Sequence, residues 1–136
     1  MKIRQTPYLF IMGDFNDYPD SRSVCRSLGV GKPEKDIDSY RLYNLMNGKQ
    51  GGTYRYRGEW GILDQLILNG TFLTHTGNLT TEYNRARILT FPFLLEEDEN
   101  YGGDKPFRTY NGMKYHGGYS DHLPVCVDID IKYPAP

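Results

Sequence analysis

One stretch near the start of the chain, Tyr8-Leu9-Phe10-Ile11-Met12-Gly13-Asp14-Phe15-Asn16, decides the fold. Its continuous apolar run predicts a β-strand covered on both faces, and the run stops at a segment rich in turn residues. In sheets with helices packed on them, catalytic side chains gather beyond the carboxyl ends of the strands. Asp14 and Asn16 supply an acid and an amide at such an end, so both can point into one cleft. A plain turn is an equally good interpretation, because Gly, Asp and Asn are the commonest turn residues.

The composition favours a sheet with long loops over a helical bundle. The chain of 136 residues has 12 Tyr, 15 Gly and 8 Pro but few Ala. A net charge of −1 gives no bulk attraction to nucleic acid or to anionic membranes, so polyanion binding needs a local patch. Neither a signal peptide nor an apolar run near the roughly 18 residues of a membrane span is recognisable, which makes the cytoplasm the default location. Cys25 and Cys126 lack metal-ligand or redox spacing, so free, buried thiols are expected.

The remaining pattern predicts a single α+β domain over residues 1–136, a mostly antiparallel sheet with helices on one face. A capping residue at Asp20 or Ser21 and apolar residues near helical spacing predict helices over 20–28 and 36–47. Alternating or continuous apolar residues predict four further strands, over 53–57, 62–68, 72–76 and 124–131, with a turn at Asn69-Gly70 between the second and third. Periodicity fades between 83 and 118, which predicts a long loop with a short apolar turn at 91–95.

Two more places carry candidate chemistry. Asp64 lies in the apolar run 62–68, where a carboxylate is costly unless it is paired; an edge strand with Asp64 in solvent is the alternative. His122, in Ser120-Asp121-His122-Leu123-Pro124, is the best proton-transfer candidate, because Asp121 adjoins it and a carboxylate such as Asp64 can hold its tautomer. With Asp14 and Asn16, these residues suit hydrolysis of a phosphate ester assisted by a divalent metal.

Basic and aromatic residues offer weaker candidates for substrate contact. Over 53–57 the favoured interpretation places Tyr54 and Tyr56 inside and the arginines in solvent, and a platform for phosphates and bases is the alternative. Long loops in compact domains are often functional, which adds residues between 83 and 118. The candidates are Arg55, Arg57, Trp60, Arg108 and Tyr110.

Taken in order, three motifs resemble the endonuclease/exonuclease/phosphatase family, whose fold is that of deoxyribonuclease I. They are Gly13-Asp14-Phe15-Asn16, the strand Ile62-Leu63-Asp64-Gln65-Leu66-Ile67-Leu68, and Ser120-Asp121-His122-Leu123-Pro124-Val125, and the match spans Tyr8 to Ile131. The resemblance implies that Asp14 positions or activates the attacking water and that Asn16 binds the scissile phosphate. It also implies that Asp64 orients His122, which contacts a phosphate oxygen, and that Asp121 is a ligand or near-ligand of the metal, usually magnesium.

The resemblance covers only the C-terminal half of that fold. Family members are longer, with a four-layered sandwich of two similar α/β halves, and the missing half normally supplies a metal-binding Glu. We therefore expect Mg²⁺ or Mn²⁺ to bind this chain alone weakly, if at all.

Two functions stay open. One is a metal-dependent, nuclease-like phosphodiesterase acting on a phosphodiester or nucleic acid, present as an incomplete, truncated domain. The other is a catalytically silent half-domain or interaction module, whose apolar sheet face is covered by a homodimer or by the missing half.

Overall fold

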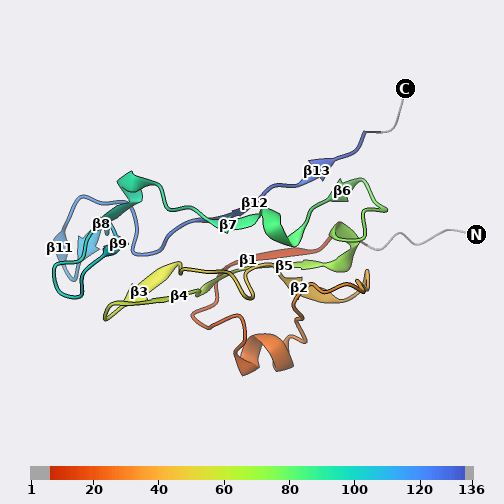
Figure 1. Ribbon diagram of the computed structural model, residues 1–136, viewed down its shortest axis with the longest axis horizontal. Coiled ribbons are helices and arrows are strands. Elements are labelled where there is room, and N and C mark those ends of the chain that lie inside the picture. The colour runs from red at the N-terminus through yellow and green to blue at the C-terminus, as the bar shows by residue number, and fades with distance from the viewer. Residues whose placement is uncertain (1–6, 134–136) are drawn as a thin grey trace, which may run out of the picture.

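The computed structural model describes residues 7–133, and within that range most of the regular structure is strand. The strands of this part of the chain form one three-stranded sheet and five two-stranded ladders, all antiparallel (Figure 1). The elements are β1 (Phe10–Asp14), the π-helical turn η1 (Ser23–Ser27), β2 (Leu42–Asn44), β3 (Tyr54–Tyr56), β4 (Glu59–Gly61), β5 (Asp64–Asn69), the 3₁₀ turn η2 (Gly70–Phe72), β6 (Leu79–Thr80), the 3₁₀ turn η3 (Tyr83–Arg85), β7 (Ala86–Ile88), the 3₁₀ turn η4 (Pro92–Leu94), β8 (Leu95–Glu97), β9 (Asp104–Pro106), β10 (Tyr110–Asn111), β11 (Lys114–Tyr115), β12 (Val125–Val127) and β13 (Asp130–Ile131). The expected mostly antiparallel sheet is confirmed, and the helical content is small.

Strand β5 is the centre of the three-stranded sheet, whose order is β1-β5-β2. Because successive side chains of a strand point to opposite faces, its apolar residues enter two separate cores. Leu66 and Leu68 pack into one core, and Ile67 packs into the other. All three are fully buried. The continuous apolar run in β5 is therefore the signature of a strand that is covered on both faces.

Different segments cover those two faces. Val125 and Val127 of β12 and Ala86 of β7 pack on the Leu66 side. Val24 of η1 packs on the Ile67 side. Figure 1 shows the β7–β12 and β6–β13 ladders on one side of the sheet and η1 on the other. The domain is thus layered around β5, with the strand ends left open.

Two sequence predictions about these elements were wrong, and a third holds only in part. Strand β1 is covered on both faces where Phe10 and Ile11 pack against the two cores, but it lies at the sheet edge and Met12 is 59% exposed. The helix predicted over 36–47 is replaced by a loop and by β2, because β2 pairs with β5 and this pairing outweighs a helical spacing of apolar residues. The strand predicted over 72–76 is absent, since η2 carries the chain away from the sheet directly after β5.

The segment predicted as a long loop contains two hairpins, β8–β9 and β10–β11. Asp98 organises the first turn: its Oδ1 accepts the N–H groups of Asn100 and Tyr101, and its backbone N–H donates to the carbonyl of Gly103. Side-chain acceptors in turns replace the periodic signal that marks longer strands. The expected apolar turn at 91–95 is confirmed as η4.

Two exposed ion pairs link neighbouring strands at the surface. Arg87 and Asp128 are 2.7 Å apart, as are Arg85 and Asp130. The hydrogen bond and charge of Arg87 lower the pKa of Asp128, and the hydrogen bond from Arg85 lowers that of Asp130. These pairs join β7 and the preceding turn η3 to the last segment of the chain.

Cys25 and Cys126 are free thiols, as expected, but both are half-buried rather than buried. No helix in the described range 7–133 has the length and apolar character needed to cross a membrane.

Candidate functional site

Two carboxylates face each other at one end of the central sheet. Asp14 is the last residue of β1 and Asp64 the first of β5, and the antiparallel register makes them direct cross-strand partners. Like charges in directly opposed positions destabilise a sheet, unless a cation or a proton donor lies between or beside them. The pairing therefore marks this edge as a place where a positive group is needed.

The turn after β1 orients the first carboxylate. Asn16 has a φ of 49°, in the left-handed region that Asn tolerates well. Its backbone N–H donates to Asp14 Oδ1 at 2.7 Å, and the Phe15 N–H donates to the Leu63 carbonyl at 2.9 Å. Gly13-Asp14-Phe15-Asn16 thus forms a turn that also orients the Asp14 carboxylate. The interpretation as a turn and the interpretation as part of a site are therefore compatible.

The His122 imidazole lies beside both carboxylates. Its Nδ1 lies 2.6 Å from Asp64 Oδ2, and its Nε2 lies 3.9 Å from Asp14 Oδ2. Because a carboxylate can only accept at Nδ1, that nitrogen carries a proton, which leaves Nε2 directed at Asp14. The Tyr54 ring packs on the imidazole, with ring centroids 4.9 Å apart, and limits its rotation.

Thr53 holds in place the two segments that carry Asp64 and His122. Nothing in the sequence around Thr53 signals this role. Its side chain is fully buried. Its Oγ1 accepts the N–H groups of Leu63 at 3.1 Å and Asp64 at 3.3 Å, while its carbonyl accepts the Leu123 N–H at 2.7 Å. One residue thereby ties the start of β5 to the segment that carries His122.

Gln65 was also missed, although a polar residue in an apolar strand is a visible signal. It is fully buried, and its Nε2 donates to the carbonyls of Asp17 at 2.9 Å and Ile62 at 3.0 Å. Its Oε1 accepts the side-chain amide of Asn44 at 2.9 Å. These bonds anchor the loop after Asn16 to the strand that carries Asp64.

The three titratable groups are close enough to share one cation. One ligand atom from each of Asp14, Asp64 and His122 lies within 4.8 Å of the others. Carboxylate oxygens are the ligands that Mg²⁺ and Mn²⁺ prefer, and imidazole is accepted by Mn²⁺. The arrangement can therefore hold a divalent cation, or it can act as a histidine paired with one carboxylate and facing a second.

The comparison with known families agrees with this geometry. A family model described as the Endonuclease/Exonuclease/phosphatase family matches residues 3–131. The chain belongs to the Endonuclease/Exonuclease/phosphatase family. The resemblance read from the three motifs is confirmed, and membership supports a hydrolase of the nuclease or phosphatase type. Searches against curated proteins and against solved structures returned no significant match.

Asp121, which the resemblance to this family makes a metal ligand, lies apart from the cluster. It is exposed and lines a separate cavity with Arg108 and Tyr110. Asn16 is exposed beside Asp14. Within residues 7–133 the cluster of potential ligands comprises Asp14, Asp64 and His122 alone.

The strand β3 reverses the expected orientation of its side chains. The Arg55 side chain is only 9% exposed, because its guanidinium bonds to Asp98 and to the carbonyls of Gly58, Gly102 and Asp104. Tyr56 is exposed instead. The prediction of inward tyrosines and solvated arginines was therefore wrong for this pair, since an arginine with a full set of acceptors can be buried.

The other weaker candidates take different places. Arg57 lies over the Tyr56 ring, with 5.2 Å from its Cζ to the ring centroid, and Arg108 lies over the Tyr54 ring at 5.6 Å. Trp60 packs beside Arg55, with 5.8 Å from the Arg55 Cζ to the Trp60 ring centroid. Tyr110 is exposed and packs edge-on against Tyr115. Arg108 is linked to His122 through the Tyr54 ring, which packs on the imidazole.

Proposed function

We propose that this chain carries the centre of a metal-dependent phosphodiesterase with nuclease-like activity. The observation that carries the proposal is the convergence of Asp14, Asp64 and His122, whose ligand atoms lie within 4.8 Å of one another at the open end of the sheet. Two acids and a histidine in one place match the needs of phosphoryl hydrolysis: a base for water, a donor to phosphate oxygens and ligands for a cation.

The donor set fits a hard divalent cation. Asp14 and Asp64 would hold Mg²⁺ or Mn²⁺ through carboxylate oxygens. The role of Asp121 as a ligand or near-ligand is proposed from the family motif alone, because Asp121 lies outside the three-residue cluster. When bound, the cation neutralises charge on the phosphoryl group. Two facing carboxylates would also repel each other less with a cation between them.

The side chains of the site have separate roles in this proposal. Asp64 holds the proton on Nδ1 of His122, so that Nε2 faces the reacting phosphate. His122 then donates a hydrogen bond to a non-bridging oxygen. Asp14 accepts a proton from the attacking water, and the Asn16 amide binds the scissile phosphate.

Hydrolysis of bis(4-nitrophenyl) phosphate, with Mg²⁺ or Mn²⁺ added, tests this assignment. His122→Asn keeps a polar side chain of similar reach but cannot carry a proton, and we expect kcat to fall by about 10² to 10⁴. His75→Asn is the matched control, because His75 is half-exposed, lies outside the cluster and has a φ of 58° that Asn tolerates. Equal activity of the two variants, with far-ultraviolet circular dichroism unchanged, would sink the proposal.

We also propose that the chain corresponds to the C-terminal half of the family's two-half sandwich. The three motifs are those of that half, and β1 is an edge strand from which Met12 is exposed and beside which Leu9 lies exposed. Exposed apolar side chains on an unpaired strand edge are a surface that a second half or a second copy would cover. A catalytically silent half-domain that binds such a partner is the competing function.

Metal titration separates the two functions. A complete centre binds Mn²⁺ tightly in calorimetry and hydrolyses the diester as a monomer. A silent half-domain gives weak or no Mn²⁺ binding, no turnover, and a dimer or complex in light scattering after size exclusion. A monomer that turns over the diester would contradict the catalytically silent half-domain.

A further inference from the structure

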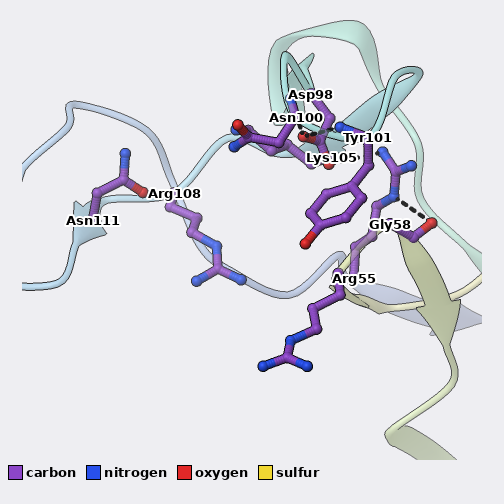
Figure 2. Close-up of a pocket in the computed structure, with 9 residues that line it drawn as sticks. Arg55, Gly58, Asp98, Asn100, Tyr101, Lys105, Arg108 and Asn111 are labelled. Atoms are coloured by element: carbon purple, nitrogen blue, oxygen red, sulfur yellow. Dashed lines mark hydrogen bonds and ion pairs between the residues drawn. The ribbon is translucent and has the colours of Figure 1, made fainter.

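A second concentration of charge lies outside the catalytic cluster, in a cavity of about 180 Å³ between the β3–β4 hairpin and the β8–β9 hairpin. Figure 2 shows its walls. The side chains that reach it from both hairpins and from the following segment are Arg57, Asn100, Tyr101, Lys105, Arg108 and Asn111. Every one of these can donate a hydrogen bond.

The base of the cavity is held together by a buried ion pair and several hydrogen bonds. Asp98 Oδ2 lies 3.3 Å from Arg55 Nη1, and both side chains are almost fully buried. Asp98 also accepts the N–H groups of Asn100 and Tyr101, and Arg55 reaches across to the carbonyls of Gly102 and Asp104. Arg55 and Asp98 thereby neutralise each other's charge, and these bonds hold the two hairpins together.

Three cations remain without such a partner. Within residues 7–133, Arg57, Lys105 and Arg108 form no ion pair with a carboxylate, and Asp98 is the one acid that lines the cavity. Lys105 and Arg108 are half-buried. All three line this partly enclosed space. Like charges around one cavity repel one another, and an anion relieves that repulsion. Phosphate oxygens accept charge-assisted hydrogen bonds from Arg and Lys.

The cavity is linked to the catalytic cluster through one aromatic ring. Arg108 lies over the Tyr54 ring, and the Tyr54 ring packs on the His122 imidazole. Arg108 also lines the adjoining cavity that contains Asp121. A chain of phosphates that enters the catalytic cluster would therefore meet Arg108 next.

The surroundings favour a nucleic acid over a small phosphate ester. Tyr101 lines the cavity, Tyr56 contacts the lining residue Arg57 through its ring, and Tyr110 lines the adjoining cavity with Arg108. Each of the three tyrosines is more than half exposed. Exposed aromatic rings beside a basic groove are the surfaces on which unpaired bases stack. We infer that this cavity binds a phosphate of a single-stranded oligonucleotide, separate from the phosphate at His122. The inference rests on the proposed function, because the phosphate at His122 is assumed. The binding test requires no hydrolysis and therefore does not depend on that function.

Binding of a fluorescein-labelled single-stranded DNA 12-mer, measured by anisotropy in EDTA, tests the inference without any turnover. In Arg57→Gln/Lys105→Gln we expect the Kd to rise at least tenfold. We also expect the slope of log affinity against log salt to fall by about 0.7, because one phosphate of a single strand is no longer neutralised. Arg26→Gln, an exposed cation in η1, is the matched control and should bind as the wild type does. Arg57→Lys/Lys105→Arg should restore most of the affinity.

A second measurement on the wild-type protein keeps the test independent of how the variants fold. The oligonucleotide should protect Lys105 from acetylation, read by mass spectrometry, and should not protect the exposed Lys35. Equal affinity of the Gln double variant and Arg26→Gln would overturn the inference, as would an oligonucleotide that protects Lys105 no more than Lys35. Binding of inorganic phosphate but not of the oligonucleotide would overturn the assignment to nucleic acid. If the Gln double variant loses affinity for the oligonucleotide but the wild-type chain hydrolyses no phosphodiester, the proposed function is refuted and this inference stands.

Discussion

Replacement of Thr53 by Val removes the oxygen that joins the two halves of the site and changes the side-chain shape very little. The Thr53 side chain is fully buried, and its Oγ1 is the acceptor for the N–H groups of Leu63 and Asp64, at 3.1 and 3.3 Å. In the valine variant both donors lose their partner. Neither the Leu63 nor the Asp64 backbone can turn to another acceptor without breaking the start of β5.

The expected cost follows from those two donors. A buried donor left without an acceptor costs about 1 to 3 kcal/mol. Both bonds here are only partly buried and the second is long, so the lower end applies to each. We expect Thr53→Val to lower the free energy of unfolding by about 2 kcal/mol, which corresponds to a fall of roughly 7 °C in Tm for a domain of this size.

Urea unfolding followed by circular dichroism measures this cost, and Thr53→Ser is the control. Serine keeps the acceptor and loses one methyl group, which should cost about 0.8 kcal/mol. The valine variant should thus be the less stable of the two, with an unchanged slope of free energy against urea. If valine costs no more than serine, Oγ1 does not hold the start of β5 and the positioning role of Thr53 is refuted.

Three further perturbations probe other parts of the molecule. Arg55→Gln leaves the buried Asp98 carboxylate without its cation and should lower the free energy of unfolding by about 3 kcal/mol in urea; a cost below 1 kcal/mol would show that the pair is not structural. Asp64→Asn should lower kcat for bis(4-nitrophenyl) phosphate by at least about 100-fold, because an amide can donate as well as accept and no longer holds the proton on Nδ1 as a carboxylate does; a fall below tenfold would contradict that role. The lowered pKa values of Asp128 and Asp130 mean that their ion pairs stabilise the fold above the ordinary carboxyl pKa of 3.8, and that this stability is lost as pH falls through the lowered values. Wild type and Asp128→Asn/Asp130→Asn should therefore differ most in Tm near pH 6, and the difference should shrink as the pH falls below 3.8 and through the lowered pKa values, whereas a constant difference would exclude the titration.

The elements that sequence reasoning predicted well are those whose signal is local. The apolar run in β5, the turn after Asp14 and the short helix before Leu28 depend on a few consecutive residues, and each is present. The helix expected over 36–47 failed because β2 gains its hydrogen bonds from β5, a partner remote in sequence. Arg55 likewise points inward because Asp98 and three carbonyls are brought to it by another hairpin.

By itself, the sequence determined which residue types carry the chemistry, their order along the chain and the family to which the chain belongs. Only the tertiary structure decided how they combine. His122 pairs with Asp64, which is 58 residues away, and does not pair with the adjacent Asp121. The physical reason is that neighbours in an extended segment point in different directions, whereas antiparallel pairing of β1 with β5 places two distant carboxylates face to face. The closing segment, tied down through Thr53, then brings the imidazole between them.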